Sequence, residues 1–240
     1  YGLIGYPLSH SFSKQYFTQK FAKEEIANHH YELFPLADLA DLRDLIQRFP
    51  NLRGLNVTIP YKERVIAFLD EIDPAAEEIG AVNTIRIERG RLKGYNTDVY
   101  GFQESLVPLL GPQMPSGALI LGTGGAAKAV AYVLTQLNIP YLKVSRSDKG
   151  DLTYAQMDAQ QLARYPLLVN TTPLGMSPQI DRCPDLPYTA LSPANVLYDL
   201  VYNPEKTLFL ERGAERSCQT KNGLEMLYLQ AEKAWEIWNA

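Results

Sequence analysis

The sequence has little cysteine and little histidine. It contains two cysteines, Cys183 and Cys218, which form no C-x-x-C pair. A disulfide framework is therefore excluded, and we expect a cytoplasmic protein from a reducing compartment. The three histidines are too few and too poorly spaced for a metal site, so we expect no metal; they are His10, His29 and His30. No signal peptide is visible, and since the chain does not begin with Met we expect a few residues to precede it.

The sequence also lacks an excess of positively charged over negatively charged residues, and it lacks long apolar runs. The 23 Lys+Arg and 27 Asp+Glu residues give a net charge of -4 without a basic block. We therefore expect no nucleic acid and no anionic membrane as a partner. No apolar run approaches the roughly 20 residues of a membrane helix. Hydrophobic residues make up 46% and charged residues 21%, as is ordinary for one large or two medium globular domains.

The first half of the chain has the pattern of strands mixed with helices. Its predicted strands are 1–4, 30–34 and 55–59, with a hairpin formed by 81–89 and 91–95. Apolar residues at three- and four-residue steps predict helices at 13–25 and 36–49, and the polar segment 70–80 is also expected to be helical.

The second half alternates more regularly. A helix at 98–110 and a linker-like stretch at 111–117 precede it. The predicted strands are 118–121, 141–145, 167–170 and 196–199, with helices at 126–137, 157–164 and 223–239. Strands that alternate with helices favour parallel βαβ units, so we predict an α/β protein.

A glycine-rich loop follows the strand at 118–121. Gly122-Thr123-Gly124-Gly125-Ala126 leads from that strand into a helix. This is the dinucleotide-binding pattern with Ala126 in place of the third glycine, and the helix N-terminus would face the pyrophosphate. Glycine-rich turns also occur without a ligand, but the strand before and the helix after favour the binding interpretation.

The end of the next strand bears on the choice of dinucleotide. Ser145-Arg146-Ser147 stands where an acidic residue would bind the ribose of NAD, so Arg146 predicts NADP. Arg146 as a solvated loop charge is the alternative, and Asp148 leaves NAD open. The strand-like segment 152–156 follows almost at once, whereas a parallel crossover normally takes a dozen or more residues. We therefore expect this crossover to be shortened and its helix to be lost or reduced to a turn.

Polar residues in the first half form a second group of candidates. Ser11 and Ser13 precede a predicted helix, where hydroxyls and N–H groups can bind a carboxylate or simply cap the helix. Lys62 follows a strand end, and Asp98 begins a helix. A surface lysine and a capping aspartate are the plain alternatives, yet together they make a usable proton-transfer pair.

Eight motifs in order resemble those of the shikimate dehydrogenase family, over nearly the whole chain. They lie at 5–13, 56–63, 80–84, 96–98, 122–126, 170–176, 198–204 and 223–231. The resemblance implies a discontinuous α/β substrate-binding domain at 1–100 plus 214–240 and a Rossmann-type NAD(P)-binding domain at 101–213. It also implies an NADP-dependent oxidoreductase that reversibly reduces 3-dehydroshikimate to shikimate, so both molecules would be its small-molecule substrates. This reaction belongs to chorismate and aromatic amino acid biosynthesis.

The resemblance also implies roles for individual residues. Lys62 and Asp98 would be catalytic. The substrate would be bound by Ser11, Ser13, Thr58, Asn83, Tyr202 and Gln230. The cofactor would be bound by Gly122, Thr123, Gly124, Gly125, Ala126, Ser145, Arg146, Ser147, Leu200 and Gly223.

Two alternative functions and the oligomeric state stay open at this point. One is a quinate/shikimate dehydrogenase with relaxed use of NAD and NADP, since the shortened crossover alters the region expected to hold the 2′-phosphate. Another is a non-catalytic nucleotide-binding sensor, because a fold alone does not prove activity. The oligomeric state is also open between monomer and homodimer.

Overall fold

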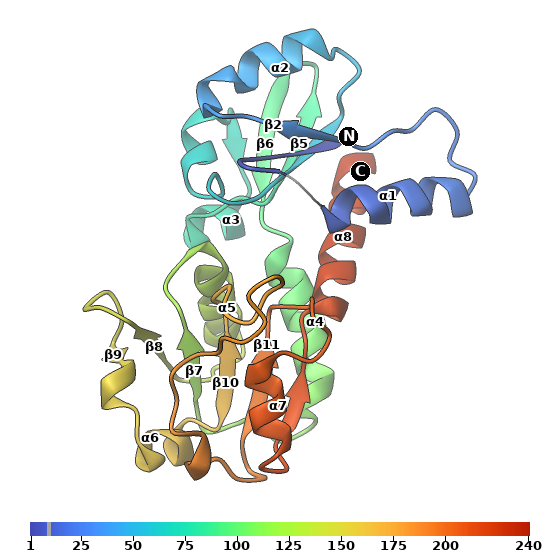
Figure 1. The fold of residues 1–240 in the computed structure, drawn as a ribbon. Helices are drawn as coiled ribbons and strands as arrows, with labels where there is room; N and C mark the ends of the chain where they lie inside the picture. Colours follow the sequence, from blue (N-terminus) through green and yellow to red (C-terminus); the bar gives the residue numbers. More distant parts are fainter. Residues whose placement is uncertain (9–10) are drawn as a thin grey trace. The chain divides into compact units, whose positions relative to one another are not determined.

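The chain forms two compact units. The computed structural model describes residues 1–8 and 11–240; Ser9 and His10 of the motif at 5–13 lie outside the described residues. One unit comprises Tyr1–Thr97 and Ala231–Ala240, and the other comprises Asp98–Gln230 (Figure 1). The first unit is therefore built from the two ends of the described chain.

The described part of the first unit contains a mixed six-stranded sheet. Its strands lie in the order β2-β1-β3-β5-β6-β4. Their bounds are β1 Gly2–Gly5, β2 Glu32–Pro35, β3 Gly54–Val57, β4 Glu71–Ile72, β5 Thr84–Glu88 and β6 Arg91–Tyr95. Strand β1 is parallel to β2 and β3, and Ile4 lies opposite both Phe34 and Val57. Strands β5 and β6 form the predicted antiparallel hairpin.

Helices cover both faces of this sheet. One core holds apolar residues of α2 (Leu42–Arg48), α3 (Pro74–Ile79) and the short helices η1 (Leu39–Asp41) and η2 (Arg64–Phe68). The other core holds residues of α1 (Phe12–Lys23) and of the end of α8 (Leu224–Asn239). The alternation of strand side chains explains the arrangement, because Ile4 enters the first core and Leu3 the second.

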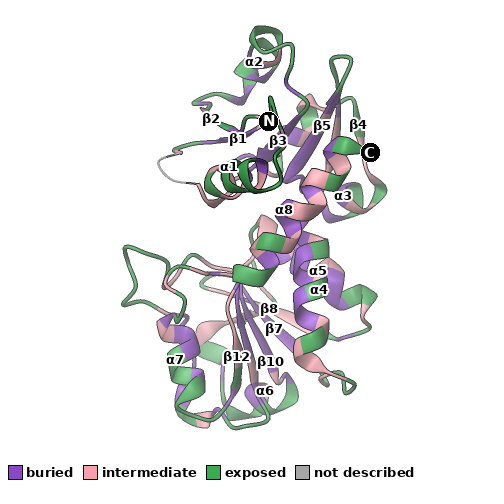
Figure 2. Cartoon of the chain, turned by 90° about the vertical axis from the view of Figure 1, so that its right-hand side faces the viewer, coloured by how far each residue is buried: buried purple, intermediate pink, exposed green. Residues whose placement is uncertain are grey.

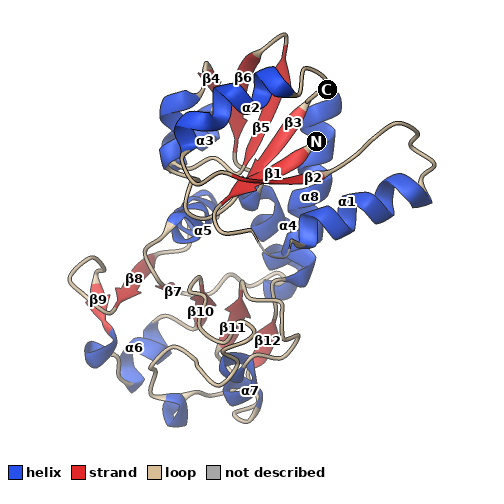
Figure 3. Ribbon diagram, turned by 45° about the horizontal axis from the view of Figure 1, so that its top comes forward, coloured by secondary structure: helices blue, strands red, loops and turns tan. Residues whose placement is uncertain are grey.

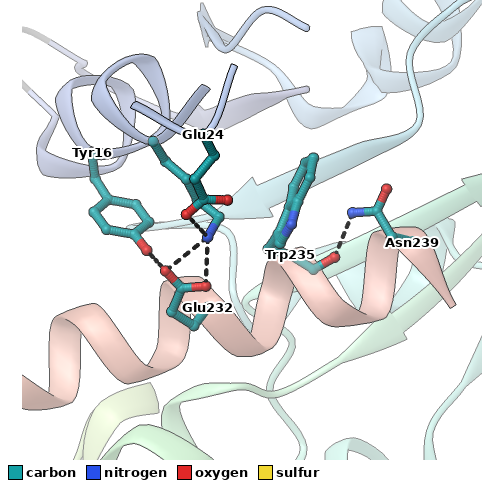
Figure 4. Close-up of polar contacts among 6 residues, drawn as sticks. Tyr16, Glu24, Glu232, Trp235 and Asn239 are labelled. Carbon is teal, nitrogen blue, oxygen red and sulfur yellow. Dashed lines mark hydrogen bonds and ion pairs between the residues drawn. The ribbon is translucent and has the colours of Figure 1, made fainter. Parts of the chain in front are cut away.

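The last helix completes the first unit. Trp238 donates its indole N–H to the carbonyl of Ile85 at 3.0 Å, and a Cβ at Gly54 would overlap its ring. Figure 4 shows Tyr16 of α1 bonded to Glu232 of α8. The ammonium group of Lys20, also on α1, lies 2.9 Å from the Glu232 carboxylate. The C-terminal residues therefore form part of the core of the unit that begins the chain.

The second unit contains a parallel sheet in the order β12-β11-β10-β7-β8-β9. Its strands are β7 Ala118–Leu121, β8 Tyr141–Ser145, β9 Leu152–Thr153, β10 Leu167–Asn170, β11 Val196–Asp199 and β12 Gln219–Lys221. Counted from β7, this is the 3-2-1-4-5-6 order of the dinucleotide-binding Rossmann fold. The predicted α/β class with a Rossmann-type domain is confirmed (Figure 3).

Helices again cover both faces. Helices α4 (Asp98–Leu110) and α5 (Gly125–Gln136) share one apolar core with the sheet, and α6 (Ala159–Arg164) and α7 (Leu208–Ala214) share the other. Strands β7 and β10 are buried at every position, as are β1 and β3 of the first unit (Figure 2). Strands buried along both faces carry the nearly continuous apolar runs of 118–121 and 167–170. Among the described residues, no helix is both long and apolar enough to cross a membrane.

The predicted short crossover is also confirmed. Residues 146–151 join β8 to β9 through turns and bends, without a helix. Asp151 stabilises this connection, since its carboxylate accepts the backbone N–H of Lys143 at 2.7 Å and its own N–H donates to the carbonyl of Lys143 at 2.8 Å. The 3-10 helix η3 (Tyr154–Gln156) follows directly, where the sequence predicted a continued strand.

Other elements differ from their predictions. Helical structure at 36–49 begins only at Leu39, and β4 occupies the start of the segment predicted as a helix at 70–80. Helix α7 and strand β12 were not predicted. Residues 214–230, predicted with the first domain, lie in the second unit, because β12 pairs with β11 of the parallel sheet.

Candidate active site

A buried polar network lies beside the end of β3 in the first unit. Asn56 donates to the hydroxyl of Thr84 at 3.2 Å and to the carbonyl of Asn83 at 3.4 Å. Asn83 is 3% exposed, and its side-chain oxygen accepts the N–H of Thr97 at 2.7 Å while its amide nitrogen donates to the Thr97 hydroxyl at 3.0 Å. These bonds fix the amide of Asn83 in one orientation and hold the residue that precedes Asp98.

Tyr31, just before β2, belongs to this network. Its hydroxyl donates to the side-chain oxygen of Asn56 at 2.7 Å. Burial raises the pKa of the Tyr31 phenol well above its usual value, so it is a neutral hydroxyl at neutral pH. The sequence predicts Tyr31 in a strand and suggests no role for it. Only the alternation of side chains along that strand could have indicated that Tyr31 is buried.

The two serines have different surroundings. Ser11 is the N-cap of α1, and its hydroxyl accepts the N–H of Lys14 at 3.4 Å. The capping interpretation therefore holds for Ser11, but a capping hydroxyl still has its own proton to donate to an anion. Ser13 lies in the first turn of the helix.

Lys62 and Thr58 lie on the loop that follows β3. Thr58 is fixed through its backbone, which donates to the carbonyl of Ile4 at 3.0 Å and accepts the N–H of Tyr61 at 2.9 Å. The carbonyl of the half-buried Lys62 accepts the N–H of Val82 at 2.7 Å. The loop is therefore tied to the segment that also carries Asn83.

Asp98 begins the second unit. It is the first residue of α4 and is 8% exposed, and Thr97 before it is held by Asn83. Gln230 lies on α8 in the same unit and is also buried, and its amide donates to the carbonyl of Leu227 at 2.9 Å. The pairing of Lys62 with Asp98 stays a prediction.

The glycine loop lies where the strand order of the second sheet reverses, between β7 and β10. Gly122 has a φ of +121°, and a Cβ there would lie 2.6 Å from the hydroxyl oxygen of Thr171, so only glycine fits without strain. A Cβ at Gly124 would meet no atom within 4 Å. Gly124 is the N-cap of α5 and brings no side chain to its free N–H groups. The loop therefore offers open space and N–H donors, as a pyrophosphate requires.

The residues after β8 are mostly exposed. Arg146 and Ser147 are solvent-exposed, and the N–H of Ser147 donates to the hydroxyl of Ser145 at 3.3 Å. Burial raises the pKa of Tyr154 to about 12, and the charge of Arg146 opposes this shift. Asp148 is exposed as well. The positions fit a 2′-phosphate contact by Arg146, which stays a prediction.

A buried carboxylate, Asp199, lies at the end of β11. It accepts hydrogen bonds from Asn170 at 2.9 Å, from the backbone of Val201 at 3.0 Å and from Thr207 at 2.6 Å. Burial raises its pKa to about 6, and these three hydrogen bonds oppose the rise. Asp199 therefore ties together the ends of β10 and β11 and the cap of α7. The sequence offered this residue only as part of a motif, without a role.

Two of the predicted site residues follow Asp199 directly. Leu200 packs against Gly223, where a Cβ would overlap its backbone, and Gly223 donates its N–H to the carbonyl of Val201 at 3.2 Å. Tyr202 is half-buried, and burial raises the pKa of its phenol. The structure therefore brings Leu200 and Gly223 together and places Tyr202 on the same short segment.

Comparison with known proteins identifies the family. The family described as the shikimate dehydrogenase substrate binding domain matches residues 3–85. A shikimate dehydrogenase (NADP(+)) of Desulforamulus reducens is 38% identical over 260 residues, covering 99% of this chain and 88% of the relative. The chain belongs to the shikimate dehydrogenase family.

Solved structures of shikimate dehydrogenases agree over the same length. The Thermus thermophilus enzyme, in complex with NADP(H) and shikimate, has a TM-score of 0.83 and 32% identity, covering 99% of this chain and 92% of that one. The Listeria monocytogenes enzyme, in complex with shikimate and NAD, has a TM-score of 0.83 and 33% identity, covering 99% and 90%.

Proposed function

We propose that this chain catalyses the reversible, NADPH-dependent reduction of 3-dehydroshikimate to shikimate. The observation that carries the proposal is similarity to a shikimate dehydrogenase (NADP(+)) across 99% of the chain. The sensor alternative is disfavoured because Lys62, Asp98 and the substrate-binding polar groups are all present. We assign the substrate to the first unit and the dinucleotide to the second.

The residues of the glycine loop fit a dinucleotide. Gly122 and Gly124 leave the approach to α5 clear of side chains, and its N-terminal N–H groups favour an anion. We assign Thr123, Gly125 and Ala126 to the same contact, Leu200 and Gly223 to the nicotinamide side, and Ser145, Arg146 and Ser147 to the 2′-phosphate. Arg146 makes NADP the preferred cofactor, with NAD as the alternative to be tested.

The polar residues of the first unit fit the substrate. Hydroxyls of Ser11 and Ser13, near the N-terminus of α1, suit its carboxylate. Thr58 and Asn83 suit the ring hydroxyls, since Asn83 is held rigidly by Thr97. From the second unit we assign Tyr202 to the carboxylate and Gln230 to a ring hydroxyl.

Lys62 and Asp98 carry the proton chemistry in this proposal. The bound nicotinamide supplies the hydride that reaches the carbonyl carbon. Lys62 donates a proton to the carbonyl oxygen as negative charge develops there, and takes it back in the oxidation. Asp98 orients the ammonium group and keeps it charged until the transfer.

The test is an absorbance assay of reduced nicotinamide with four pairs, in which shikimate or quinate is combined with NADP or NAD. We expect strong turnover only with shikimate and NADP. Comparable turnover with NAD would refute the cofactor preference, and efficient oxidation of quinate would place the chain in the relaxed branch. Absence of turnover with all four pairs would refute the enzymatic proposal.

The catalytic assignment is tested by Lys62→Ala. We expect turnover to fall about a hundredfold or more, as is usual for loss of an acid–base group, while shikimate binding partly survives. Lys23→Ala, which removes an exposed lysine at the end of α1, serves as the matched control. Near-normal turnover of Lys62→Ala would remove this lysine from the mechanism.

We also propose that the enzyme acts in the cytoplasm, which its low cysteine content supports. Cell fractionation followed by the same assay tests this location. The choice between monomer and homodimer is open to light scattering of the purified protein.

A further inference from the structure

The carboxylate of Asp199 lies between the two segments that follow β10 and β11 in the second unit. Asp199 ends β11 and stands directly opposite Asn170, which ends the neighbouring strand β10, and both residues are fully buried. One carboxylate oxygen accepts the amide N–H of Asn170 at 2.9 Å and the backbone N–H of Val201 at 3.0 Å. The other oxygen accepts the hydroxyl of Thr207, the cap of α7, at 2.6 Å. A single side chain therefore fixes the ends of both strands.

The directions of these hydrogen bonds suit the charged form of Asp199. The side-chain oxygen of Asn170 accepts the N–H and the hydroxyl of Thr172, at 3.0 Å and 2.6 Å, so its amide nitrogen is the atom that faces Asp199. The hydroxyl of Thr207 accepts the N–H of Leu210 at 3.4 Å, which leaves its own proton for the carboxylate. Asp199 therefore faces three donors, and a carboxyl proton would have to displace one of them.

The surroundings of this carboxylate contain hydrogen-bond donors but no counter-charge. The contacts of Asp199 come from β10, from the segment after β11 and from the cap of α7, and in the described part of the chain none of them is with a charged side chain. Burial raises the pKa of the carboxyl group to about 6, so it is still mostly ionised at neutral pH. Lowering the pH through 6 therefore adds a proton that competes with the three donors.

Both segments lie beside the proposed dinucleotide site of the same unit. Thr171 follows β10, and a Cβ at Gly122 would lie 2.6 Å from its hydroxyl oxygen, so this segment lies against the glycine loop. Leu200 follows β11; its N–H donates to the carbonyl of Asn170 at 3.0 Å, and its backbone packs against Gly223. The conformation of the two segments therefore sets the space that a nucleotide can enter.

We propose that the ionised carboxylate of Asp199 is a positioning group for the dinucleotide, which holds the segments after β10 and β11 in the conformation that receives the nicotinamide half. The inference rests on the proposed function, in which Leu200 and Gly223 lie on the nicotinamide side. Asp199 is fully buried, so it acts on the nucleotide only through these segments. Without its hydrogen bonds the segments spend only part of the time in the receiving conformation, and the apparent affinity falls by that fraction. A bound nucleotide selects the correct conformation, so the saturated enzyme should keep most of its turnover.

The experiment measures the binding of NADPH to Asp199→Ala and Asp199→Asn by nucleotide fluorescence. Asp199→Ala removes both acceptor oxygens, and we expect the Kd at pH 7.5 to rise about tenfold or more, the effect of losing hydrogen bonds to a charged group. Asp199→Asn keeps one oxygen without the charge and should raise the Kd about threefold. In the assay with shikimate, the KM for NADP should rise by the same factors, while kcat changes less than about threefold.

The pH dependence gives a readout that a merely structural contact would not move. The ratio of the Kd of Asp199→Asn to that of the wild type cancels the titration of the nucleotide itself. We expect this ratio to narrow from about three at pH 7.5 toward one at pH 5.5, because the wild-type carboxyl group takes up a proton over this range. A ratio that stays constant overturns the inference.

Asn195→Ala is the matched control. Asn195 is also buried in the second unit, where it donates to the carbonyl of Leu162 at 2.9 Å and accepts the N–H of Ser192 at 3.0 Å. It precedes β11 and so lies at the opposite end of that strand from Asp199. Its loss should lower the temperature of unfolding and leave the Kd for NADPH unchanged. Thermal unfolding of every variant shows which are folded in the assay, and Asp199→Asn carries the test by itself where Asp199→Ala is unfolded.

The outcomes separate the inference from the function on which it rests. A normal Kd for NADPH in both Asp199 variants overturns only the inference, and so does a loss confined to kcat or an equal loss of binding in Asn195→Ala. Weakened NADPH binding by the Asp199 variants of a chain that turns over no shikimate supports the inference and refutes the proposed reaction. A wild-type chain that binds no NADPH refutes both.

Discussion

Replacing Asp199 by asparagine should change how the stability of this protein depends on pH. The carboxyl group is fully buried and accepts three hydrogen bonds, and its pKa is raised from 3.8 to about 6, chiefly by burial. In the unfolded chain the group ionises near pH 4. Asparagine keeps the shape and an oxygen that accepts the N–H of Val201, but it carries no charge at any pH.

The sign follows from the protons bound in each state. Between about pH 4 and pH 6 the folded protein holds a proton on Asp199 that the unfolded chain has released. The free energy of unfolding therefore falls as pH rises through this interval, and the full cost of the buried charge is present above pH 6. The difference between 3.8 and about 6 corresponds to about 3 kcal/mol, at about 1.4 kcal/mol for each pH unit.

The assay is urea unfolding of the wild type and Asp199→Asn from pH 4.5 to pH 7.5. We expect the variant to gain about 2 kcal/mol of stability relative to the wild type from pH 4.5 to pH 7.5, since the rest of the roughly 3 kcal/mol lies below pH 4.5. Asp181→Asn, at an exposed aspartate of the same unit, is the control and should show no such trend. A constant difference between Asp199→Asn and the wild type at every pH would refute the reasoning.

Two further variants test the glycine loop and the C-terminal helix. Gly122→Ala should weaken NADPH binding at least about tenfold, measured by nucleotide fluorescence, because the residue has a φ of +121° and a Cβ would crowd Thr171. Unchanged NADPH binding would contradict the glycine-loop assignment. Trp238→Phe should lower the free energy of unfolding by about 1–3 kcal/mol, since the buried indole ring and its hydrogen bond to the carbonyl of Ile85 are lost. Urea unfolding measures this change, and a difference below about 0.5 kcal/mol would contradict it.

Sequence patterns predicted those elements that agree with their own local preferences. Helix α4 was predicted at its observed bounds, 98–110, and β7 and β10 were predicted as strands at 118–121 and 167–170. The shortened crossover followed from chain length alone, since six residues cannot form a covering helix. In each of these cases the local sequence and the tertiary structure favour the same conformation.

Other elements depend on contacts that no local pattern contains. Leu36 has helical spacing with later leucines, yet it lies before the helix, which starts after Asp38 caps Ala40 at 3.0 Å. Strand β12 is a short, polar edge strand that exists because β11 offers its backbone groups. Tertiary pairing overrides a weak local preference at such places.

The candidate site shows the same division. Gly122 and Lys62 could be predicted as site residues from the sequence, because a glycine and a charged residue at a strand end suggest their role by residue type alone. Tyr31 and Asp199 acquire their roles from partners distant in sequence, such as Asn56 for Tyr31. A tyrosine in a strand and an aspartate after one have ordinary structural explanations, so only the folded contacts identify them.

The placement of Trp238 in the core of the first unit affects the order in which the newly made protein matures. During translation the ribosome delivers residues 1–97 first, but the ring that fills the space at Gly54 and bonds to Ile85 is synthesised more than 140 residues later. The second unit is one continuous segment, 98–230, and has all its strands before that tryptophan is made. Synthesis of the first unit therefore begins before that of the second, but its core is completed later, which reverses the usual N-to-C order of domain folding.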